Sequence, residues 1–494
     1  MKGNAVFLTD GVMAQSELQV KRLPQRFVSD DRRVITRFFD PGGESRIRSV
    51  VVRVLGLTTQ QAEATLAQTL CRYNQRHRDI GDVFLDHFKR LAQVHNLPQS
   101  LCKVKQMLIG AYFTMEYSVE SAALFNPSIV PAANQEGIDE GDLRFILSLR
   151  ATGEGHKSSI VFRTGVVQAS GSLSFDTPSP YLHRVRRVPN ESVEEEWLRR
   201  ALIAMDSYSD AAQVILDQLG DTFTLGEIED LCHDAEKSAV FTDAAQSILW
   251  ICHSNYTLAL PENTDPSEIV IFPTTENEQH GIEDARFVQF YENDGSTTLY
   301  GTFTAVNGSQ IQCQLMEIQD FRRIRVRTLH GYFAQNKGLA LFPRRIQGLY
   351  AMLSRVDGEN NYVMCSTDIT CWENASLLQT PQYPWEFMQI GNCGSPLETE
   401  KGWLMLTHGV GPMREYCIGA CLLEKEDPTK VIGTLREPLI VPAEDEREGY
   451  VPNVVYSCGA LIHNGELIIP YAMADSATSF AAVSVDTLLS HLLA

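Results

Sequence analysis

Short apolar runs recur along most of the chain, each followed by a polar residue, a tight turn and a second apolar run. Five segments share this pattern: FILSLRATGEGHKSSIVF, YGTFTAVNGSQIQCQLMEI, YAMLSRVDGENNYVMCSTD, WLMLTHGVGPMREYCIGACLL and IIPYAMADSATSFAAVSVD. Their first runs end at Arg150, Thr304, Arg355, His408 and Asp475. Apolar runs of this length, separated by Gly-, Asn- or Asp-containing turns, predict antiparallel β-hairpins.

The spacing of these hairpins predicts a repeated architecture. The last four strand ends are 51, 53 and 67 residues apart, and 154 residues separate the first two. A period of about fifty residues with several strands per unit is typical of β-propeller blades. We therefore expect an all-β core in the form of a five-bladed β-propeller, with a β-sandwich of similar hairpins as the alternative. In a propeller the innermost strands end around one mouth, so the polar strand ends are expected to form a pocket.

Two stretches carry helical rather than strand periodicity. Apolar side chains recur at three- and four-residue spacing from about residue 58 to 106, and again from about residue 191 to 251. The second stretch accounts for the long interval between the first two hairpins. Upstream, the run VVVRVL at residues 50–55 is rich in β-branched residues and predicts a strand. We expect an N-terminal α+β extension over residues 1–110 and a propeller over residues 111–494, with a helical insertion at about 191–251.

Composition narrows the classes of partner. The chain has 494 residues, 44% of them hydrophobic and 21% charged, and a formal net charge of -20. This charge argues against nucleic acid or an anionic membrane as a partner, because phosphate-rich surfaces are bound by excess Lys and Arg. Eleven cysteines without CxxC pairs, and an N-terminus without a long apolar core, predict reduced thiols and a cytoplasmic protein. Metal and dinucleotide motifs are absent from the sequence, so we expect no metal and no cofactor.

The sequence GIEDAR at residues 281–286 is the strongest candidate for chemistry, and the apolar run 287–291 after it predicts a strand. Neighbouring side chains on a strand point to opposite faces, so Asp284 and Arg286 should share a face that excludes Glu283. An aspartate beside an arginine can hold a sugar and supply a proton. A surface ion pair is the alternative interpretation.

Several motifs resemble, in order, those of glycoside hydrolase family 130, the mannoside phosphorylases and β-mannosidases built on a five-bladed propeller. The motifs are NPSIV, GIEDAR, LFPRRI, GNCGSPLETEKGWLMLTHGVG, DPTKVIG, VPNVVYSCGA and PYAMAD, and they cover roughly residue 111 to the C-terminus apart from the inserted helices. The resemblance implies inverting cleavage of a β-mannosidic bond. It also implies that Asp284 is the general acid, acting through a hydroxyl of the bound mannose.

Seven polar side chains are candidate substrate ligands, because polyol recognition needs dense donors and acceptors. They are Asn126, Arg150, Arg286, Lys337, Arg355, His408 and Asp475. The resemblance puts Arg150, Lys337 and Asp475 at or near a phosphate subsite. For His408, a satisfied pocket histidine is the equal alternative.

Hydrolysis and phosphorolysis differ in the nucleophile. Inverting hydrolysis needs a base that activates water, whereas phosphorolysis needs cations that hold phosphate. In phosphorylases of the family a His usually precedes the Arg of YAMLSRVDG, where this chain has Ser354, and an Arg usually follows the turn at residues 307–312, where this chain has none. Glu359 lies just beyond the same strand end and is the candidate base, with Glu398 and Glu400 as rivals and a solvated turn residue as the alternative.

These differences favour an inverting β-mannosidase acting on short manno-oligosaccharides. The second reading is a β-mannoside phosphorylase, which would use inorganic phosphate as co-substrate and release mannose 1-phosphate. The third is a non-catalytic propeller that binds carbohydrate or a protein, because a fold alone does not fix a function. Homo-oligomerisation through the N-terminal or inserted helices stays open.

Overall fold

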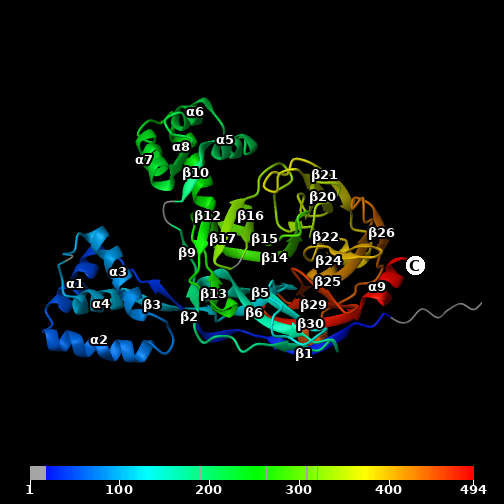
Figure 1. Ribbon diagram of the computed structural model, residues 1–494, viewed down its shortest axis with the longest axis horizontal. Helices are drawn as coiled ribbons and strands as arrows, with labels where there is room; N and C mark the ends of the chain where they lie inside the picture. Colours follow the sequence, from blue (N-terminus) through cyan, green and yellow to red (C-terminus); the bar gives the residue numbers. More distant parts are fainter. Residues whose placement is uncertain (1–17, 99, 189–190, 263, 308–309, 320) are drawn as a thin grey trace, which may run out of the picture.

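The computed structural model describes residues 18–98, 100–188, 191–262, 264–307, 310–319 and 321–494. Its body is dominated by β-structure, and most strands form five antiparallel units of four strands, with the helices at the periphery (Figure 1). In four of the units the strands form a meander that follows the order of the chain, and in the last unit the outer strand comes from the N-terminal region. The recurring hairpins of the sequence are the central strands of these units.

The first two units are joined in one sheet by a parallel contact between β6 and β14. Unit one contains β4 (Ala123–Pro131), β5 (Leu143–Thr152), β6 (Ser158–Val167) and β7 (Leu173–Phe175). Unit two contains β14 (Gly281–Tyr291), β15 (Thr297–Asn307), β16 (Gln310–Ile318) and β17 (Arg323–Thr328), and is extended by β12 (Tyr256–Ala259) and β9 (Arg186–Arg187). β13 (Ile269–Ile271) pairs with β6 and with β8 (His183–Arg184).

The remaining three units are separate sheets. Unit three contains β18 (Ala340–Leu341), β19 (Tyr350–Ser354), β20 (Asn361–Ser366) and β21 (Ala375–Gln379). Unit four contains β22 (Gln389–Asn392), β24 (Gly402–Val410), β25 (Tyr416–Leu423) and β26 (Val431–Thr434), with β23 (Leu397–Thr399) against β24. Unit five contains β27 (Val455–Tyr456), β29 (Glu466–Met473), β30 (Ala477–Ser484) and β1 (Lys21–Phe27), with β28 (Leu461–His463) against β29 and helix α9 (Val485–Leu492) after β30.

Strand β1 ties the start of the described chain to its end. It pairs antiparallel with β30, so the outer strand of unit five comes from the N-terminal region. A domain boundary at residue 110 would therefore separate this strand from the sheet that it completes. Neighbouring units pack through apolar clusters; between units three and four, for example, the rings of Phe342 and Trp403 meet edge to face at 5.2 Å.

The N-terminal helices lie at one side of the body between the paired strands β2 (Asp30–Phe38) and β3 (Thr114–Glu120). They are α1 (Glu44–Leu55), α2 (Thr59–Tyr73), α3 (Ile80–His95) and α4 (Lys103–Tyr112). The helical prediction from residue 58 to 106 is confirmed. The strand prediction for residues 50–55 is wrong, because Ile47, Val51 and Val54 are spaced to bury one helical face and do so in α1.

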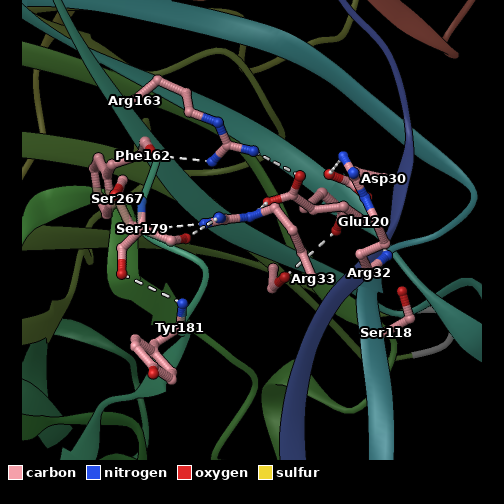
Figure 2. A network of polar contacts seen from close by, with 12 residues as sticks. Asp30, Arg32, Arg33, Ser118, Glu120, Phe162, Arg163, Ser179, Tyr181 and Ser267 are labelled. Carbon is pink, nitrogen blue, oxygen red and sulfur yellow. Dashed lines mark hydrogen bonds and ion pairs between the residues drawn. The ribbon is translucent and has the colours of Figure 1, made fainter. Parts of the chain in front are cut away.

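A buried ion cluster fixes this region to unit one (Figure 2). Glu120, at the end of β3, is fully buried between Arg33 of β2 at 2.9 Å and Arg163 of β6 at 2.6 Å. Arg33 also donates to the backbone carbonyls of Ser179 and Ser267. The carboxylate therefore offsets two desolvated guanidinium groups on elements that are distant in sequence.

The helical insertion is also confirmed. It comprises β10 (Ser192–Glu194), α5 (Glu195–Ala204), α6 (Asp210–Leu216), β11 (Thr222–Thr224), α7 (Leu225–Ala235) and α8 (Thr242–Ser254). It has its own apolar core and lies beyond the ends of β12 and β16 (Figure 1). Within the described ranges, no helix is both long enough and apolar enough to cross a membrane. All eleven cysteines are free thiols, and the cytoplasmic location stays a prediction.

Candidate active site

A polar pocket of about 180 Å³ lies where strand ends of all five units meet. Its lining residues are Asn126, Arg150, Glu283, Asp284, Lys337, Arg355, Gln389, His408, Arg414, Tyr416, Val451, Val454, Tyr456 and Asp475. Seven of these were candidates from the sequence, although they are scattered over some 350 residues of chain. The expected convergence of polar strand ends is therefore what the structure has, except that Thr304 is buried in its sheet instead.

The GIEDAR segment departs from regular strand alternation. The strand begins at Gly281, not at residue 287, and its pairing with β15 shifts between Glu283 and Arg286. Asp284 has a φ of 54°, in the left-handed region that Asp and Asn tolerate best. This bulge turns Glu283 and Asp284 into the same pocket, so the prediction that they face opposite ways is wrong.

Other pocket residues share this backbone conformation. Asn126 has a φ of 46° at a similar register shift in β4, and Asp475 has a φ of 52° in the turn after β29. Such conformations cost of order 1–3 kcal/mol each and cluster at functional sites. Three strained Asx residues around one cavity indicate a site selected for ligand contact rather than for stability.

Asp284 is held by donors on two sides. Its Oδ1 accepts hydrogen bonds from Asn126 Nδ2 at 2.6 Å and from Arg150 at 3.3 Å. Glu283 bridges Arg150 at 2.7 Å and Lys337 Nζ at 2.6 Å. The two carboxylates and the two cations thus form a closed set of ion pairs along one wall.

Two carboxyl groups in the pocket have pKa values shifted in opposite directions. Burial alone would raise the pKa of Asp284, but the charges of Arg150, Lys337 and Arg286 outweigh it and lower that pKa below 3.8. Burial, reinforced by the charge of Asp284, raises the pKa of Asp475 to about 6. Two nearby carboxyl groups whose pKa values are shifted in opposite directions are typical of sites that transfer protons.

His408 is neutral and has a defined tautomer. Burial and the charges of Arg355 and Arg286 lower its pKa well below 6.5. Nδ1 lies 3.1 Å from the carbonyl of Asn392, which can only accept, so Nδ1 carries the proton. Nε2 then accepts from Arg355 at 3.3 Å and orients that guanidinium towards the pocket.

The structure places the remaining candidates elsewhere. Arg286 is buried beneath the pocket, where it donates to the Tyr456 hydroxyl at 2.5 Å. Glu359 is exposed in the turn after β19 and does not line the pocket. Its assignment as base has no support from this geometry. Glu398 is paired with Arg344 and Lys425 at a separate cavity, and Glu400 is in an exposed turn.

Sequence reasoning missed several residues of the pocket wall. Arg414 is the most consequential, because it adds a cation from the turn of the fourth hairpin, GPMREY. That turn belongs to the hairpin repeat recognised in the sequence, so its arginine could have been named as a pocket residue. Ser354 is fully buried and donates to the carbonyl of Phe333, so it contributes nothing to the pocket. Of the other turn expected to hold an arginine, residues 308–309 lie outside the described residues.

No cluster of His, Cys, Asp and Glu suited to a metal ion occurs among the residues with a described position. The donor set of the pocket is instead rich in guanidinium and amide groups, which suit anions and hydroxyl groups. The arrangement can bind a polar, partly anionic ligand and present two carboxyls to it.

Parts of the chain are similar to known proteins. Residues 261–493 match the family model of glycoside hydrolase family 130, described as beta-1,4-mannooligosaccharide phosphorylase. A 1,2-beta-oligomannan phosphorylase of a Thermoanaerobacter species is 35% identical over 152 residues, which are 30% of this chain and 51% of that protein. A beta-1,2-mannobiose phosphorylase of Listeria innocua is 28% identical over 229 residues, which are 45% of this chain and 63% of that protein.

The solved structure of the Listeria innocua enzyme, in complex with beta-1,2-mannobiose, aligns with a TM-score of 0.44 at 22% identity, over 76% of this chain and 93% of that one. The matched segments span about half to two thirds of the two curated relatives. The family match contains Asp284, Lys337, Arg355, His408, Arg414 and Asp475. The C-terminal half of the chain is therefore similar to glycoside hydrolase family 130.

Proposed function

We propose that this protein is a β-mannoside phosphorylase, which cleaves short manno-oligosaccharides with inorganic phosphate and releases mannose 1-phosphate. The five sheet units would be the blades of a five-bladed propeller, with the pocket at one mouth of its channel. The assignment replaces the hydrolase reading favoured by sequence alone. The relatives in the family are phosphorylases, and the predicted base of hydrolysis lies outside the pocket.

The observation that carries the proposal is an excess of unpaired cations. Arg150 and Lys337 are paired with carboxylates, whereas Arg355 contacts only the neutral His408 among the contacts described. Among the described residues, the buried Nε of Arg355 has no hydrogen-bond partner, and the exposed Arg414 forms no ion pair, although its charge acts on Asp475 at longer range. Guanidinium groups without an ion-pair partner can bind a phosphate dianion through charge-assisted hydrogen bonds.

In the proposed reaction a phosphate oxygen attacks the anomeric carbon while the glycosidic carbon–oxygen bond breaks. The leaving oxygen takes up a proton delivered from Asp284, and the configuration inverts. The neighbouring cations lower the pKa of Asp284, so this carboxyl is ionised at neutral pH. The negative charge of a phosphate dianion bound in the same pocket would raise this pKa, so phosphate binding would prepare Asp284 to carry the proton.

Hydrolysis is the second candidate because of Asp475. This half-buried carboxyl, with a pKa of about 6, would be ionised at neutral pH and could take a proton from a water molecule. The same charge would repel phosphate. The positive charges of Arg355 and Arg414 offset this repulsion, so the pocket favours phosphorolysis over hydrolysis.

Product analysis separates the two reactions. The substrates are β-1,2-mannobiose, β-1,4-mannobiose and β-1,4-mannosyl-glucose, each with and without inorganic phosphate. We expect mannose 1-phosphate in the presence of phosphate and negligible turnover in its absence. Free mannose formed at equal rates in both buffers would establish hydrolysis. Asp284→Asn should abolish either reaction while preserving sugar binding.

Arg355→Gln tests the phosphate site directly. A charge-assisted hydrogen bond contributes about 1.5–3 kcal/mol, so the KM for phosphate should rise about 10- to 150-fold. The KM for the sugar should change much less. Arg344→Gln is the matched control, because Arg344 is paired with Glu398 at a different cavity. Equal effects of the two substitutions on the KM for phosphate would contradict the assignment of Arg355.

A further inference from the structure

A second and larger cavity, of about 860 Å³, lies between the inserted helices and unit two. We call it the insertion cleft. One side is formed by α8, through Gln246 and Trp250, and by Asp206 after α5. The other side is formed by the ends of β15 and β16 and by the loop 330–336. The helical insertion therefore builds a wall of this cleft.

The insertion cleft and the catalytic pocket share a wall. Asn336 lines the cleft and the next residue, Lys337, lines the pocket; the side chain of Asn336 accepts the backbone N–H of Lys337 at 2.8 Å. On the neighbouring strands, Ala305 lines the cleft opposite Ile282, and Glu283 enters the pocket. A chain leaving the pocket past Lys337 would thus reach the cleft directly.

The two cavities have different charge. Among the described residues that line the insertion cleft, only Asp206 and Glu373 carry a carboxylate, and there is no lysine or arginine. A cavity of this composition repels anions and suits a neutral ligand. The pocket beside it, with four cations, suits the phosphate.

Fixed amide groups line the cleft floor. Asn277 donates to Gln312 Oε1 at 3.1 Å, and Gln312 donates in turn to Thr328 Oγ1 at 3.0 Å. Because these side chains hold one another, their remaining donors and acceptors have set directions, as the recognition of ring hydroxyls requires. An apolar ligand would leave these groups unsatisfied.

Aromatic rings lie at the cleft as well. Tyr332 is 66% exposed at the cleft and meets Phe333 edge to face at 4.9 Å. Trp250 is half-buried on the opposite side. Exposed aromatic faces beside amide groups suit a ligand that has both apolar C–H faces and hydroxyl groups.

We propose that the insertion cleft binds the neutral glycan chain of the substrate beyond the sugars held in the catalytic pocket. This inference rests on the proposed function. The pocket, at about 180 Å³, is smaller than the range of about 300–1,000 Å³ of ordinary ligand sites, whereas the cleft falls within it. The helical insertion is thereby a determinant of chain-length specificity, and oligosaccharides are better substrates than disaccharides.

The test is the dependence of kcat/KM on chain length for β-1,2- and β-1,4-manno-oligosaccharides, from disaccharide to hexasaccharide, with phosphate. In the full-length protein we expect kcat/KM to rise with length. Tyr332→Ala should reduce it about two- to tenfold for the longer substrates and leave the disaccharide value unchanged. Gln246→Ala, on the exposed face of α8, should act in the same direction. Tyr112→Ala is the control, since Tyr112 is 51% exposed on α4, outside the cleft.

A flat length profile, or an equal loss at every length in Tyr332→Ala, would overturn the inference and leave the proposed function standing. Absence of turnover with every substrate would instead refute the proposed function. In that case titration calorimetry with the hexasaccharides decides about the cleft. Binding weakened by Tyr332→Ala but not by Tyr112→Ala would support it, and equal or no binding would overturn it.

Discussion

Replacing Asp475 by asparagine removes a titrating carboxyl from the pocket while keeping its shape. In the folded protein, burial and the neighbouring charge of Asp284 raise the pKa of Asp475 from 3.8 to about 6. A carboxyl whose pKa is raised on folding stabilises the protein when it is protonated. That contribution is complete below pH 3.8 and is lost as the pH rises through about 6.

The size of the effect follows from the shift. A change from 3.8 to about 6 corresponds to about 3 kcal/mol over the whole titration. Between about pH 4.5 and about pH 7.5, where the protein can be handled, the wild type should lose about 2 kcal/mol from this group. The asparagine variant has no such group, so its free energy of unfolding relative to wild type should rise by about 2 kcal/mol over that range.

Urea unfolding of both proteins at a series of pH values, in buffers without phosphate, measures this difference. Asp357→Asn is a control that should show no pH dependence over this range. Although burial opposes it, hydrogen bonds from Asn360, the backbone N–H of Glu359 and Tyr362 lower the pKa of Asp357 to about 2. This contribution is already complete above about pH 4.5, so the difference between the Asp357 variant and wild type should stay constant from there to about pH 7.5. A pH-independent difference for Asp475→Asn would refute the argument that this carboxyl is buried beside a second charge.

Two further substitutions test the framework around the site. Glu120→Gln leaves two buried arginines without their carboxylate and should lower the free energy of unfolding, measured in urea, by about 3–5 kcal/mol. The control Glu44→Gln, at an exposed ion pair, should lower it by less than about 1 kcal/mol. Similar losses in the two variants would mean that the Glu120 cluster is not desolvated. Gly394→Ala places a Cβ 2.3 Å from the carbonyl oxygen of Cys458 at a φ of 105°, and should prevent accumulation of folded protein. Gly137→Ala, with a φ of 75° but open space, should cost about 1 kcal/mol and fold normally; a well-folded Gly394→Ala would contradict the close packing there.

The parts of the fold that could be predicted are those encoded locally. Alternating apolar residues with a turn between them define a hairpin wherever they occur, so the recurrence of hairpins and the two helical regions were readable. The run at residues 50–55 was misjudged because β-branched composition favours a strand, whereas its helix is fixed by burial of Val51 and Val54 against neighbouring helices. The pairing of β1 with β30 joins residues more than 450 positions apart, and no local pattern indicates such a contact.

In the candidate site, too, the features encoded locally were predictable and the others were not. Residues at the ends of central strands were predictable, because the repeat brings four of the five to the same pocket; Thr304 is the exception. The bulge at Asp284 was not, since one additional residue in a strand leaves no trace in the alternation of side chains, yet it turns Glu283 into the pocket. The role of Glu359 was inferred from its position in sequence. The structure puts it in a turn whose direction the sequence does not specify.

The choice between water and phosphate is therefore a question of local charge. The net charge of -20 acts against any anion at long range, but salt screens that field beyond about 8 Å at physiological ionic strength. Within that distance the ligand meets the guanidinium groups of Arg355 and Arg414, which form no ion pair with a carboxylate in the described structure. Arg355 is half-buried and Arg414 is exposed, so a bound dianion would gain charge-assisted hydrogen bonds from both without displacing an existing ion pair. Ser354, the substitution that suggested hydrolysis, is buried away from the pocket and does not alter this balance.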